Sequence, residues 1–303
     1  MALSGATVAV TGATGFIGRY LVDVLKARGV HVVAAVRSPE RAADLGVEVR
    51  RADLADPVAL EQSVAGADAV VSIAALVSIG EASPAELVRT NVRGTENVLR
   101  AAAAAGVRRI VQMSSAVVYR PKRGHYYRED DPLRDEGDGR TRLSSYAVSK
   151  ACAERAAWRL ADELDLQLST VRPHTVFGAF DRQTFSRWLS RFMRPPVSVF
   201  PTHLYLPPVY AGDLAAAVAR ILDRDDAPPQ AYNVAHAPDL HSYWDLMEAY
   251  RAAGGRTPRL VIPVPVPLRR RFDVERITAL GWHPRPLVQS FTDMLARESA
   301  EPA

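Results

Sequence analysis

The stretch Thr11-Gly12-Ala13-Thr14-Gly15-Phe16-Ile17-Gly18 decides the fold class of this chain. It comes directly after the apolar, β-branched run 7–10 and opens a segment with apolar residues at three- and four-residue spacing, 17–25. A glycine-rich turn between a strand and a helix is the context of a dinucleotide-binding loop. A plain glycine-rich turn is the alternative, but the strand, the helix and the N-terminal position together favour the loop.

Each glycine of this loop has a separate physical role. Gly12 permits the tight turn, Gly15 lets the backbone approach a pyrophosphate, and Gly18 allows the helix to pack on the strand. The free N–H groups at the start of the helix would then meet the pyrophosphate. The loop therefore predicts a cofactor site made of Gly12, Thr14, Gly15, Phe16, Ile17 and Gly18.

Strand-like and helix-like segments alternate through the first half of the chain. Short apolar runs occur at 7–10, 30–36, 47–50, 69–73, 109–113 and 166–171, separated by helical segments such as 86–105. Strands that alternate with helices predict a parallel sheet covered on both faces. We therefore expect an α/β fold: a doubly wound parallel Rossmann sheet with a smaller C-terminal substrate-binding cap.

The second half of the chain is less regular. Proline pairs occur at 195–196, 207–208 and 228–229, and a strand-helix unit returns at 208–222, followed by a short strand at 232–234. This pattern predicts that the chain leaves the sheet domain and re-enters it. The expected dinucleotide-binding domain covers residues 1–175 and 208–235, and the expected cap covers 176–207 and 236–303.

The end of the second predicted strand bears on the choice between NAD and NADP. An Asp or Glu there usually holds the ribose 2′-hydroxyl of NAD, whereas a 2′-phosphate needs a cation. The strand ends Ala35-Val36-Arg37-Ser38, without an acid. The Arg37 guanidinium can bind a phosphate through two hydrogen bonds and Ser38 can add a third. We therefore expect NADP(H) as the preferred cofactor, with NAD(H) as the alternative. A solvated strand end is the alternative interpretation of Arg37.

Two further strand ends complete the predicted cofactor site. Asp53 and Leu54 follow the third strand and are expected to reach the adenine. Ala74 and Ala75 follow the fourth strand, where their small side chains would line the cofactor. The carboxyl ends of parallel strands share one edge of the sheet, which is where ligands bind in such folds.

Tyr146 and Lys150 are candidate catalytic residues. They lie four positions apart on a predicted helix and so share one face, while Ser114 and Ser115 close the predicted strand 109–113. Carbonyl reduction needs a proton at the oxygen, and a free tyrosine, with a pKa of about 10, is a poor acid/base near neutrality. A neighbouring ammonium lowers that pKa. We predict Tyr146 as the acid/base, Lys150 as its activator and a ligand of the nicotinamide ribose, and Ser115 as the group that aligns the substrate oxygen.

The lysine content strengthens this interpretation. A Tyr-x-x-x-Lys spacing alone often arises by chance. However, only Lys26, Lys122 and Lys150 are lysines among the 38 basic residues. Retaining a lysine at position 150 fits a need for the compact ammonium, which arginine does not supply.

Further motifs extend the pattern along nearly the whole chain. They are NVRGT at 91–95, SSAVVY at 114–119, Glu154 after the Tyr146–Lys150 segment, VRP at 171–173, VYAGD at 209–213, YNV at 232–234 and LGWHP at 280–284. With them the chain resembles the extended short-chain dehydrogenase/reductases, a group that includes nucleotide-sugar epimerases and dehydratases, dihydroflavonol reductases and 3β-hydroxysteroid dehydrogenases. The resemblance implies that Ser115 orients the substrate and that Asn91 is structural. It also implies that Ser114 and the backbone near Pro173, His174 and Thr175 contact the nicotinamide.

Two departures from the family pattern concern the substrate. Nucleotide-sugar members commonly carry an arginine just before the strand at 208–210, where this chain has the apolar and aromatic stretch LYLPP at 204–208. Cap arginines could substitute, although helical arginines are more often solvated; they are Arg182, Arg187, Arg191 and Arg194. The charged segment 120–144 is unusually long and is predicted to be a mobile lid, with a surface insertion of no role as the alternative. Both features favour a less charged, ring-containing substrate.

These observations lead to three function hypotheses. The first is an oxidoreductase that transfers hydride between NADP(H) and a carbonyl/alcohol substrate, with a tyrosine as acid/base. The alternative enzyme is a nucleotide-sugar epimerase or dehydratase with tightly held NAD(P). The third is a non-catalytic NADP-binding sensor protein, against which the intact Tyr146/Lys150 pair argues, because such proteins typically lose it.

Composition excludes several other classes. The net charge of +4 is spread along the chain, which argues against nucleic-acid binding, and the apolar runs are too short for a membrane span. Cys152 is the only cysteine and the strand pattern starts directly after residue 5, so we expect a cytoplasmic protein with no internal disulfide and no signal peptide. The seven histidines show no metal-ligand spacing, so we predict no metal. The expected partner is a small-molecule substrate, and a homodimer is left open.

Overall fold

The computed structural model divides the chain into two compact units. The first consists of Met1–Pro121, Glu129–Arg172 and Ala215–Tyr232, and the second of Lys122–Arg128, Pro173–Leu214 and Asn233–Ala303. The structure describes residues 3–76, 83–122, 126–138, 142–181, 193, 196–200, 204–205, 207–224, 227–236, 242–264 and 269–300. The division into a cofactor domain and a substrate-binding cap stays a prediction.

A seven-stranded parallel sheet forms the centre of the first unit. Its order is β11-β7-β5-β4-β1-β2-β3. The strands are β1 (Thr7–Thr11), β2 (His31–Val36), β3 (Glu48–Arg51), β4 (Ala69–Ser72), β5 (Arg109–Met113), β7 (Gln167–Pro173) and β11 (Ala231–Val234). β1 pairs in parallel with both β2 and β4, so the direction of winding reverses between β1 and β4. Ligands bind at such a switch point, outside the carboxyl ends of the strands.

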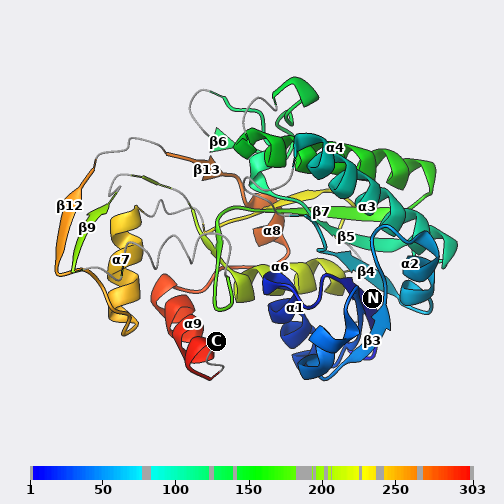
Figure 1. Cartoon of the computed structure of the whole chain (residues 1–303), viewed down its shortest axis with the longest axis horizontal. Helices are drawn as coiled ribbons and strands as arrows, with labels where there is room; N and C mark the ends of the chain where they lie inside the picture. The colour runs from blue at the N-terminus through cyan, green and yellow to red at the C-terminus, as the bar shows by residue number, and fades with distance from the viewer. Residues whose placement is uncertain are drawn as a thin grey trace. The chain divides into compact units, whose positions relative to one another are not determined.

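Helices cover both faces of this sheet (Figure 1). On one face lie α2 (Pro57–Val64), α3 (Pro84–Ala104) and α4 (Arg142–Glu163), and on the other lie α1 (Phe16–Ala27) and α6 (Ala211–Asp223). Leu60, Leu99 and Leu160, one from each helix of the first group, share an apolar core with Val33 and Ile110 of the sheet. Burial on both faces explains why the central strands are almost wholly apolar.

Local sequence signals explain where these helices begin. The side chains of Asp56 and Ser83 accept hydrogen bonds from the N–H groups of Ala59 and Glu86, and a proline follows each cap. This is the arrangement expected at a helix N-terminus. Three short 3₁₀ segments complete the connections: η1 (Pro39–Leu45), η2 (Ala116–Val118) and η3 (Glu136–Asp138).

Among its described residues, the second unit contains three small parallel strand pairs and the helices α7, α8 and α9. The pairs are β6 (Tyr126–Tyr127) with β13 (Arg271–Phe272), β8 (Val176–Phe177) with β10 (Val209–Tyr210), and β9 (Val197–Phe200) with β12 (Leu260–Pro263). The helices are α7 (Tyr243–Ala252), α8 (Glu275–Ala279) and α9 (Leu287–Ala300). Phe291 of α9 packs against the rings of Phe177 and Tyr250, which gives this unit a core of its own.

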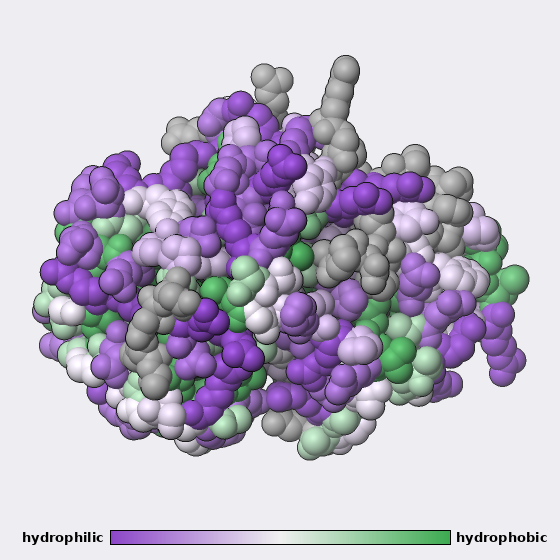
Figure 2. Space-filling view, turned by 180° about the vertical axis from the view of Figure 1, so that it is seen from behind, coloured by the Kyte–Doolittle hydropathy of each residue, from purple (hydrophilic) through white to green (hydrophobic). Residues whose placement is uncertain are grey.

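One side of the β9/β12 pair is exposed and apolar. Val197, Val199, Leu260 and Ile262 are 48–57% exposed. The residues between them are the buried Ser198 and the half-buried Val261. Figure 2 shows apolar surface over these two strands, at the right of the view. Among the described residues, no helix is long and apolar enough to cross a membrane.

The fold class predicted from the sequence is confirmed. The chain has an α/β fold with a doubly wound parallel sheet and a smaller unit that contains most of the C-terminal residues. The sequence did not predict the strand pairs of the second unit, because their members lie as far apart in the chain as Tyr126 and Arg271.

Candidate active site

The loop between β1 and α1 leaves no room for side chains at two of its glycines. Gly12 has φ +75°, and a Cβ there would lie 2.8 Å from the backbone nitrogen of Ala74. A Cβ on Gly18 would lie 2.2 Å from the carbonyl oxygen of Gly12. The first contact brings the end of β1 against the end of β4, and the second packs α1 on its own loop. The turn and packing roles predicted for these glycines therefore correspond to real steric limits.

The start of α1 is suited to an anion. Gly15 is the N-cap residue, it has no side chain that could cap the helix, and the first turn carries no acidic residue. The first N–H groups of a helix lack partners within the helix, and the helix dipole places partial positive charge there. This twelve-residue helix therefore fits the pyrophosphate of a dinucleotide, and Phe16 and Ile17 would supply N–H groups. The Gly15 N–H already donates to the carbonyl oxygen of Gly12 at 3.0 Å and closes the turn.

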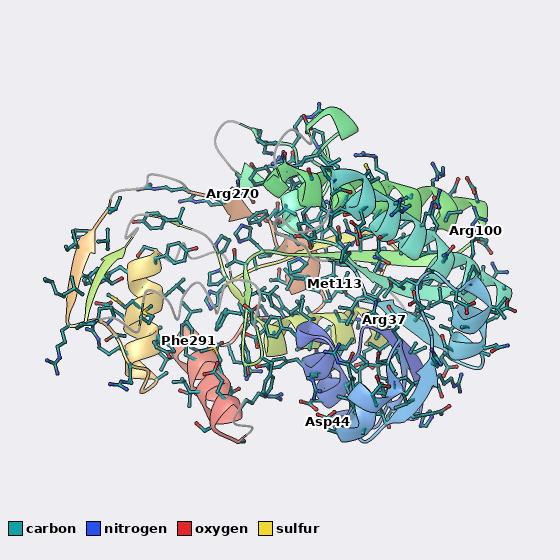
Figure 3. The ribbon with its side chains drawn as sticks, in the orientation of Figure 1. Arg37, Asp44, Arg100, Met113, Arg270 and Phe291 are labelled. Carbon is teal, nitrogen blue, oxygen red and sulfur yellow. The ribbon has the colours of Figure 1, made fainter. Side chains whose placement is uncertain are left out.

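Arg37 and Ser38 follow β2 at the same edge of the sheet. The Arg37 side chain is exposed, and among the described residues it has no ion pair or side-chain hydrogen bond. Ser38 is the N-cap residue of η1, but its side chain makes no capping hydrogen bond. Figure 3 labels Arg37 together with Met113, which ends the parallel strand β5. A guanidinium that has no partner among the described residues is available for a phosphate at this edge.

The other predicted cofactor residues lie at the ends of β3 and β4. Asp53 accepts a hydrogen bond from the N–H of Ala55 at 2.9 Å, which fixes a turn. The carbonyl oxygen of Leu54 accepts one from Asn97 Nδ2 at 2.8 Å. Ala74 N donates to Thr11 Oγ1 at 3.4 Å, and Ala75 follows, half-buried. These contacts fix the backbone of both strand ends, and the β4 end lies against the glycine loop.

The three candidate catalytic residues come from α4 and the end of β5. Lys150 Nζ donates to the carbonyl oxygen of Met113 at 2.8 Å. This bond holds the helix face that carries Tyr146 and Lys150 at the strand end, directly before Ser114 and Ser115. Ser115 is half-buried and accepts a long hydrogen bond, 3.4 Å, from the N–H of Val117. All of these residues belong to the first unit, as does the glycine loop.

Burial changes the pKa values of both α4 residues. It raises the pKa of Tyr146 to about 12, because a phenolate there would lose hydration. It lowers the pKa of Lys150 to about 8, against the attraction of the Glu154 carboxylate. The sequence predicts that Lys150 lowers the pKa of Tyr146. Desolvation of the phenol raises that pKa instead, so Tyr146 is a protonated acid at neutral pH.

A buried charge network lies directly behind these residues. Glu154 and Arg172 are 1% and 4% exposed, and Arg172 Nη2 lies 2.5 Å from Glu154 Oε1. Ser114 Oγ donates to Glu154 Oε2 at 2.5 Å, so its hydroxyl is engaged within the protein. Arg172 also donates to Tyr119 Oη at 2.9 Å. Glu154 and Arg172 stand in the sequence motifs without an assigned role, although an arginine directly after the strand-like run 166–171 was a signal.

Asn91 links three elements of the first unit. Its Oδ1 accepts a hydrogen bond from Leu76 N at 2.8 Å, and its Nδ2 donates to Ser149 Oγ at 3.0 Å. Ser149 Oγ in turn donates to the carbonyl oxygen of Tyr146 at 2.8 Å. The side chain of Asn91 thus ties α3 to α4 and to the chain after β4, in line with the structural role that the resemblance implied.

The remaining predicted residues belong to the second unit or lie outside the described residues. Pro173, His174 and Thr175 begin a segment of the second unit. His174 is buried, which lowers its pKa to about 3 and keeps it neutral, and its Nδ1 lies 2.7 Å from Thr175 Oγ1. Their contact with a nicotinamide stays a prediction. Arg182, Arg187, Arg191 and Arg194 lie outside the described residues. Within the described part of the chain, no group of His, Cys, Asp or Glu is arranged to hold a metal ion.

Known proteins resemble this chain in sequence and in structure. Residues 8–235 match the sequence model of the NAD dependent epimerase/dehydratase family. The chain is 31% identical over 233 residues to "Cinnamoyl-CoA reductase 1" of Petunia hybrida, covering 73% of this chain and 69% of the relative. It is 36% identical over 176 residues to "4-hydroxy-2-methyl-3-oxo-4-farnesyl-3,4-dihydroquinoline-1-oxide ketoreductase" of Stigmatella aurantiaca, covering 57% and 51%. The solved structure "MoeE5 in complex with UDP-glucuronic acid and NAD" is similar with a TM-score of 0.78 and 26% identity, over 97% of this chain and 100% of that one.

Proposed function

The chain belongs to the NAD dependent epimerase/dehydratase family, and on that premise we propose that it is an NADP-dependent oxidoreductase that interconverts a carbonyl compound and an alcohol. The observation that carries this proposal is the hydrogen bond from Lys150 to the Met113 carbonyl. It holds the face of α4 with Tyr146 and Lys150 at the carboxyl end of β5, next to Ser115. The glycine loop and the free guanidinium of Arg37 belong to the same unit.

The cofactor site fits a dinucleotide with a 2′-phosphate. Gly12 and Gly18 leave the space that the loop needs, and the uncapped N-terminus of α1 suits a pyrophosphate. Arg37 would bind the 2′-phosphate and Ser38 would add a hydrogen bond. When bound, the nicotinamide supplies or accepts the hydride.

The protein side chains divide the remaining chemistry. In the direction of reduction, Tyr146 gives its phenolic proton to the carbonyl oxygen as that oxygen gains negative charge. Ser115 donates a hydrogen bond to the same oxygen and aligns it. The Lys150 ammonium stabilises the phenolate that remains on Tyr146 and binds the nicotinamide ribose. In the direction of oxidation the same tyrosine takes the proton back.

A second enzyme function has some support. The similar solved structure is a complex with UDP-glucuronic acid and NAD, which favours a nucleotide-sugar epimerase or dehydratase with tightly held cofactor. Net reduction is favoured instead by the two relatives named as reductases, cinnamoyl-CoA reductase and the ketoreductase. The apolar stretch at 204–208, where nucleotide-sugar members carry an arginine, also supports reduction.

The test is consumption of added NADPH with a panel of aryl ketones, aldehydes and acyl thioesters, beside UDP-sugars. We expect turnover of an uncharged, ring-containing carbonyl compound, and loss of about 10²–10⁴-fold in kcat for Tyr146→Phe, with nearly unchanged NADPH affinity. Conversion of a UDP-sugar without net NADPH consumption would support the epimerase or dehydratase instead. NADPH binding with no turnover of any panel member would favour a sensor protein, and full activity of Tyr146→Phe would remove the assigned acid/base.

A further inference from the structure

Glu154 stands at the third position of a regular series on α4. Tyr146, Lys150 and Glu154 follow one another at four-residue spacing, so their side chains lie along one face of the helix. Lys150 and Glu154 are 4% and 1% exposed. A buried ammonium and a buried carboxylate one turn apart attract each other even without direct contact, because little water screens them.

The Glu154 carboxylate is surrounded by donors. Ser114 Oγ lies 2.5 Å from Oε2 and Thr170 Oγ1 lies 3.0 Å from Oε1. Arg172 donates from Nε at 3.0 and 3.1 Å and from Nη2 at 2.5 Å, and Trp158 Nε1 donates at 3.3 Å. Arg172 and these hydrogen bonds outweigh burial and hold the pKa of Glu154 below its ordinary value. The side chain is therefore a carboxylate at neutral pH.

Besides Glu154, Glu129 is a buried acid of this network: its carbonyl oxygen accepts a hydrogen bond from Arg172, and its charge acts on Tyr119. Arg172 comes from β7 and is bound to Glu154, while β5 supplies the Met113 carbonyl and the Ser114 hydroxyl. From α3 comes the uncharged amide of Asn91, which binds Ser149, and Tyr146 is a neutral phenol. Burial disfavours the Lys150 ammonium and Glu154 opposes that effect. Among these groups, Glu154 is the source of negative charge near the lysine.

We propose that Glu154 is a positioning residue for Lys150: its carboxylate keeps the ammonium charged at neutral pH and, through Ser114, ties the end of β5 to α4. Arg172 moderates this effect, because its guanidinium neutralises part of the charge that Lys150 experiences. The inference rests on the proposed function only in giving Lys150 a role in turnover. The charge state of Lys150 is measurable without any substrate.

This arrangement predicts opposite effects for the two partners. In Glu154→Gln the negative charge disappears and Arg172 is left unpaired, so the Lys150 ammonium becomes less stable. In Arg172→Met the carboxylate faces Lys150 without its counter-ion, so the ammonium becomes more stable. In the double variant Glu154→Gln/Arg172→Met both charges are gone. The titration midpoint of Lys150 should then lie between its values in Glu154→Gln and in the wild type. Purely structural damage would shift the Lys150 midpoint in the same direction in both single variants.

The chain offers a direct measurement, because it contains only three lysines. In protein labelled with ¹³C-lysine, the Cε signals of Lys26, Lys122 and Lys150 can be followed by NMR against pH, and Lys150→Met assigns the signal of Lys150. We expect the Lys150 midpoint to fall by about one pH unit or more in Glu154→Gln, a tenfold or larger rise in acid dissociation constant, and to rise in Arg172→Met. Lys26 and Lys122 should not move.

The controls separate the possible failures. Thr170→Val removes one hydrogen bond to Glu154 but no charge, so the Lys150 midpoint should stay within a few tenths of a pH unit. The double variant replaces a buried ion pair by neutral side chains, which proteins often tolerate, so it serves if a single variant does not fold. An unchanged Lys150 midpoint in Glu154→Gln or in the double variant, or a shift of both single variants in one direction, overturns the proposal. The expected shifts combined with an activity that does not depend on Tyr146 would uphold it and overturn the proposed function instead.

Discussion

Burial favours the protonated phenol of Tyr146 but disfavours the charged ammonium of Lys150, and reduction needs both of these forms. The raised pKa of Tyr146, about 12, keeps the phenol protonated, which is the form needed to reduce a carbonyl. The lowered pKa of Lys150, about 8, places the loss of its charge within reach of ordinary buffers. A base with a lowered pKa is protonated below that value and neutral above it. Lys150, and not Tyr146, should therefore limit reduction at alkaline pH.

We expect kcat/KM for carbonyl reduction to be flat near neutrality and to fall above about pH 8, because deprotonated Lys150 no longer stabilises the phenolate of Tyr146. The measurement is the pH profile of NADPH consumption by wild type and by Lys150→Arg. The arginine keeps its charge at every accessible pH, so its alkaline limb should disappear even if its overall rate is lower. A wild-type limb near pH 10, the ordinary region for lysine, would contradict this assignment.

The free guanidinium of Arg37 leads to a prediction about cofactor choice. Arg37→Ala should weaken NADPH binding by about 1.5–3 kcal/mol, which is the usual worth of a charged hydrogen-bonded contact, and leave NADH binding unchanged. Calorimetric titration of both cofactors measures this. Arg100→Ala is the matched control, because Arg100 is an exposed arginine of α3 at a distance from Arg37 (Figure 3). If NADH binds as tightly as NADPH to the wild type, Arg37 does not select the cofactor.

At the scale of the element, the β1–α1 loop can be tested against a glycine of the same conformation. Gly12 and Gly66 both have φ +75°. A Cβ on Gly12 would clash with the backbone of Ala74, whereas a Cβ on Gly66 would meet no atom within 4 Å. Gly66→Ala should cost only the conformational penalty, about 1 kcal/mol in the free energy of unfolding. Gly12→Ala should cost more and should also abolish cofactor binding, because the loop must move. Urea denaturation and NADPH titration of both variants check this, and normal NADPH affinity in Gly12→Ala would show that the loop is not a cofactor site.

A non-glycine residue with left-handed backbone, Asp165, follows the C-terminus of α4, and a substitution by glycine should relieve its strain. Asp165 has φ +52°, and Leu166 N donates to the carbonyl oxygen of Ala161 at 2.8 Å, as in a Schellman motif that usually has glycine at the position of Asp165. Asp165→Gly should stabilise the protein by about 0.5–1 kcal/mol. The exposed ion pair with Arg108, at 3.6 Å, contributes little. Asp165→Asn separates the effect of charge from that of backbone conformation, and urea unfolding of the three proteins gives the comparison.

The elements that the sequence predicted well are those with strong local signals. β1, α1, β5 and the helix with Tyr146 and Lys150 follow from apolar periodicity, glycine positions and four-residue spacing. Local signals also located Arg37 at a strand end. The network of Ser114, Glu154 and Arg172 did not follow, because it joins three elements whose contact depends on tertiary packing. The shift in the pKa of Tyr146 had the opposite sign from expectation, because the sequence shows the neighbouring lysine but not the depth of burial.

The segment 120–144 shows the same limit. Its charge and glycine content predicted a mobile lid over its whole length. In the structure, Arg120 N donates to the carbonyl oxygen of Pro132 and Arg134 N to that of Val118, while Tyr126 and Tyr127 pair with β13 of the second unit. The described part of this segment is thus tied to both units in different places, and lid motion stays a prediction. Sequence composition alone does not reveal such long-range pairing.

At the scale of the whole molecule, the family match covers the first unit from residue 8 on but only part of the second. The family match ends at residue 235, whereas α7, α8 and α9 of the second unit follow it. The residues proposed for proton transfer and for the 2′-phosphate all lie in the first unit. We therefore expect substrate choice to depend on the second unit, which holds the residues beyond the family match, and cofactor choice to depend on the first.

The buried ammonium of Lys150 should also be visible in the stability of the whole protein. Its folded pKa, about 8, is below the ordinary value of 10.5, so between these values the unfolded chain binds more protons than the folded one, and stability rises with pH. Below pH 8 the charged lysine costs about 3 kcal/mol relative to its neutral form. Lys150→Met should therefore stabilise the protein at pH 7, and the gain should shrink as pH rises toward 10.

Lys26→Met is the matched control, because Lys26 is exposed and its Nζ also donates to a backbone carbonyl oxygen, that of Leu45, at 2.7 Å. Urea unfolding of wild type and both variants at pH 7 and near pH 10 gives the comparison. A Lys150→Met variant that is less stable than wild type at pH 7 would mean that Lys150 is held by stronger contacts than its carbonyl bond and Glu154.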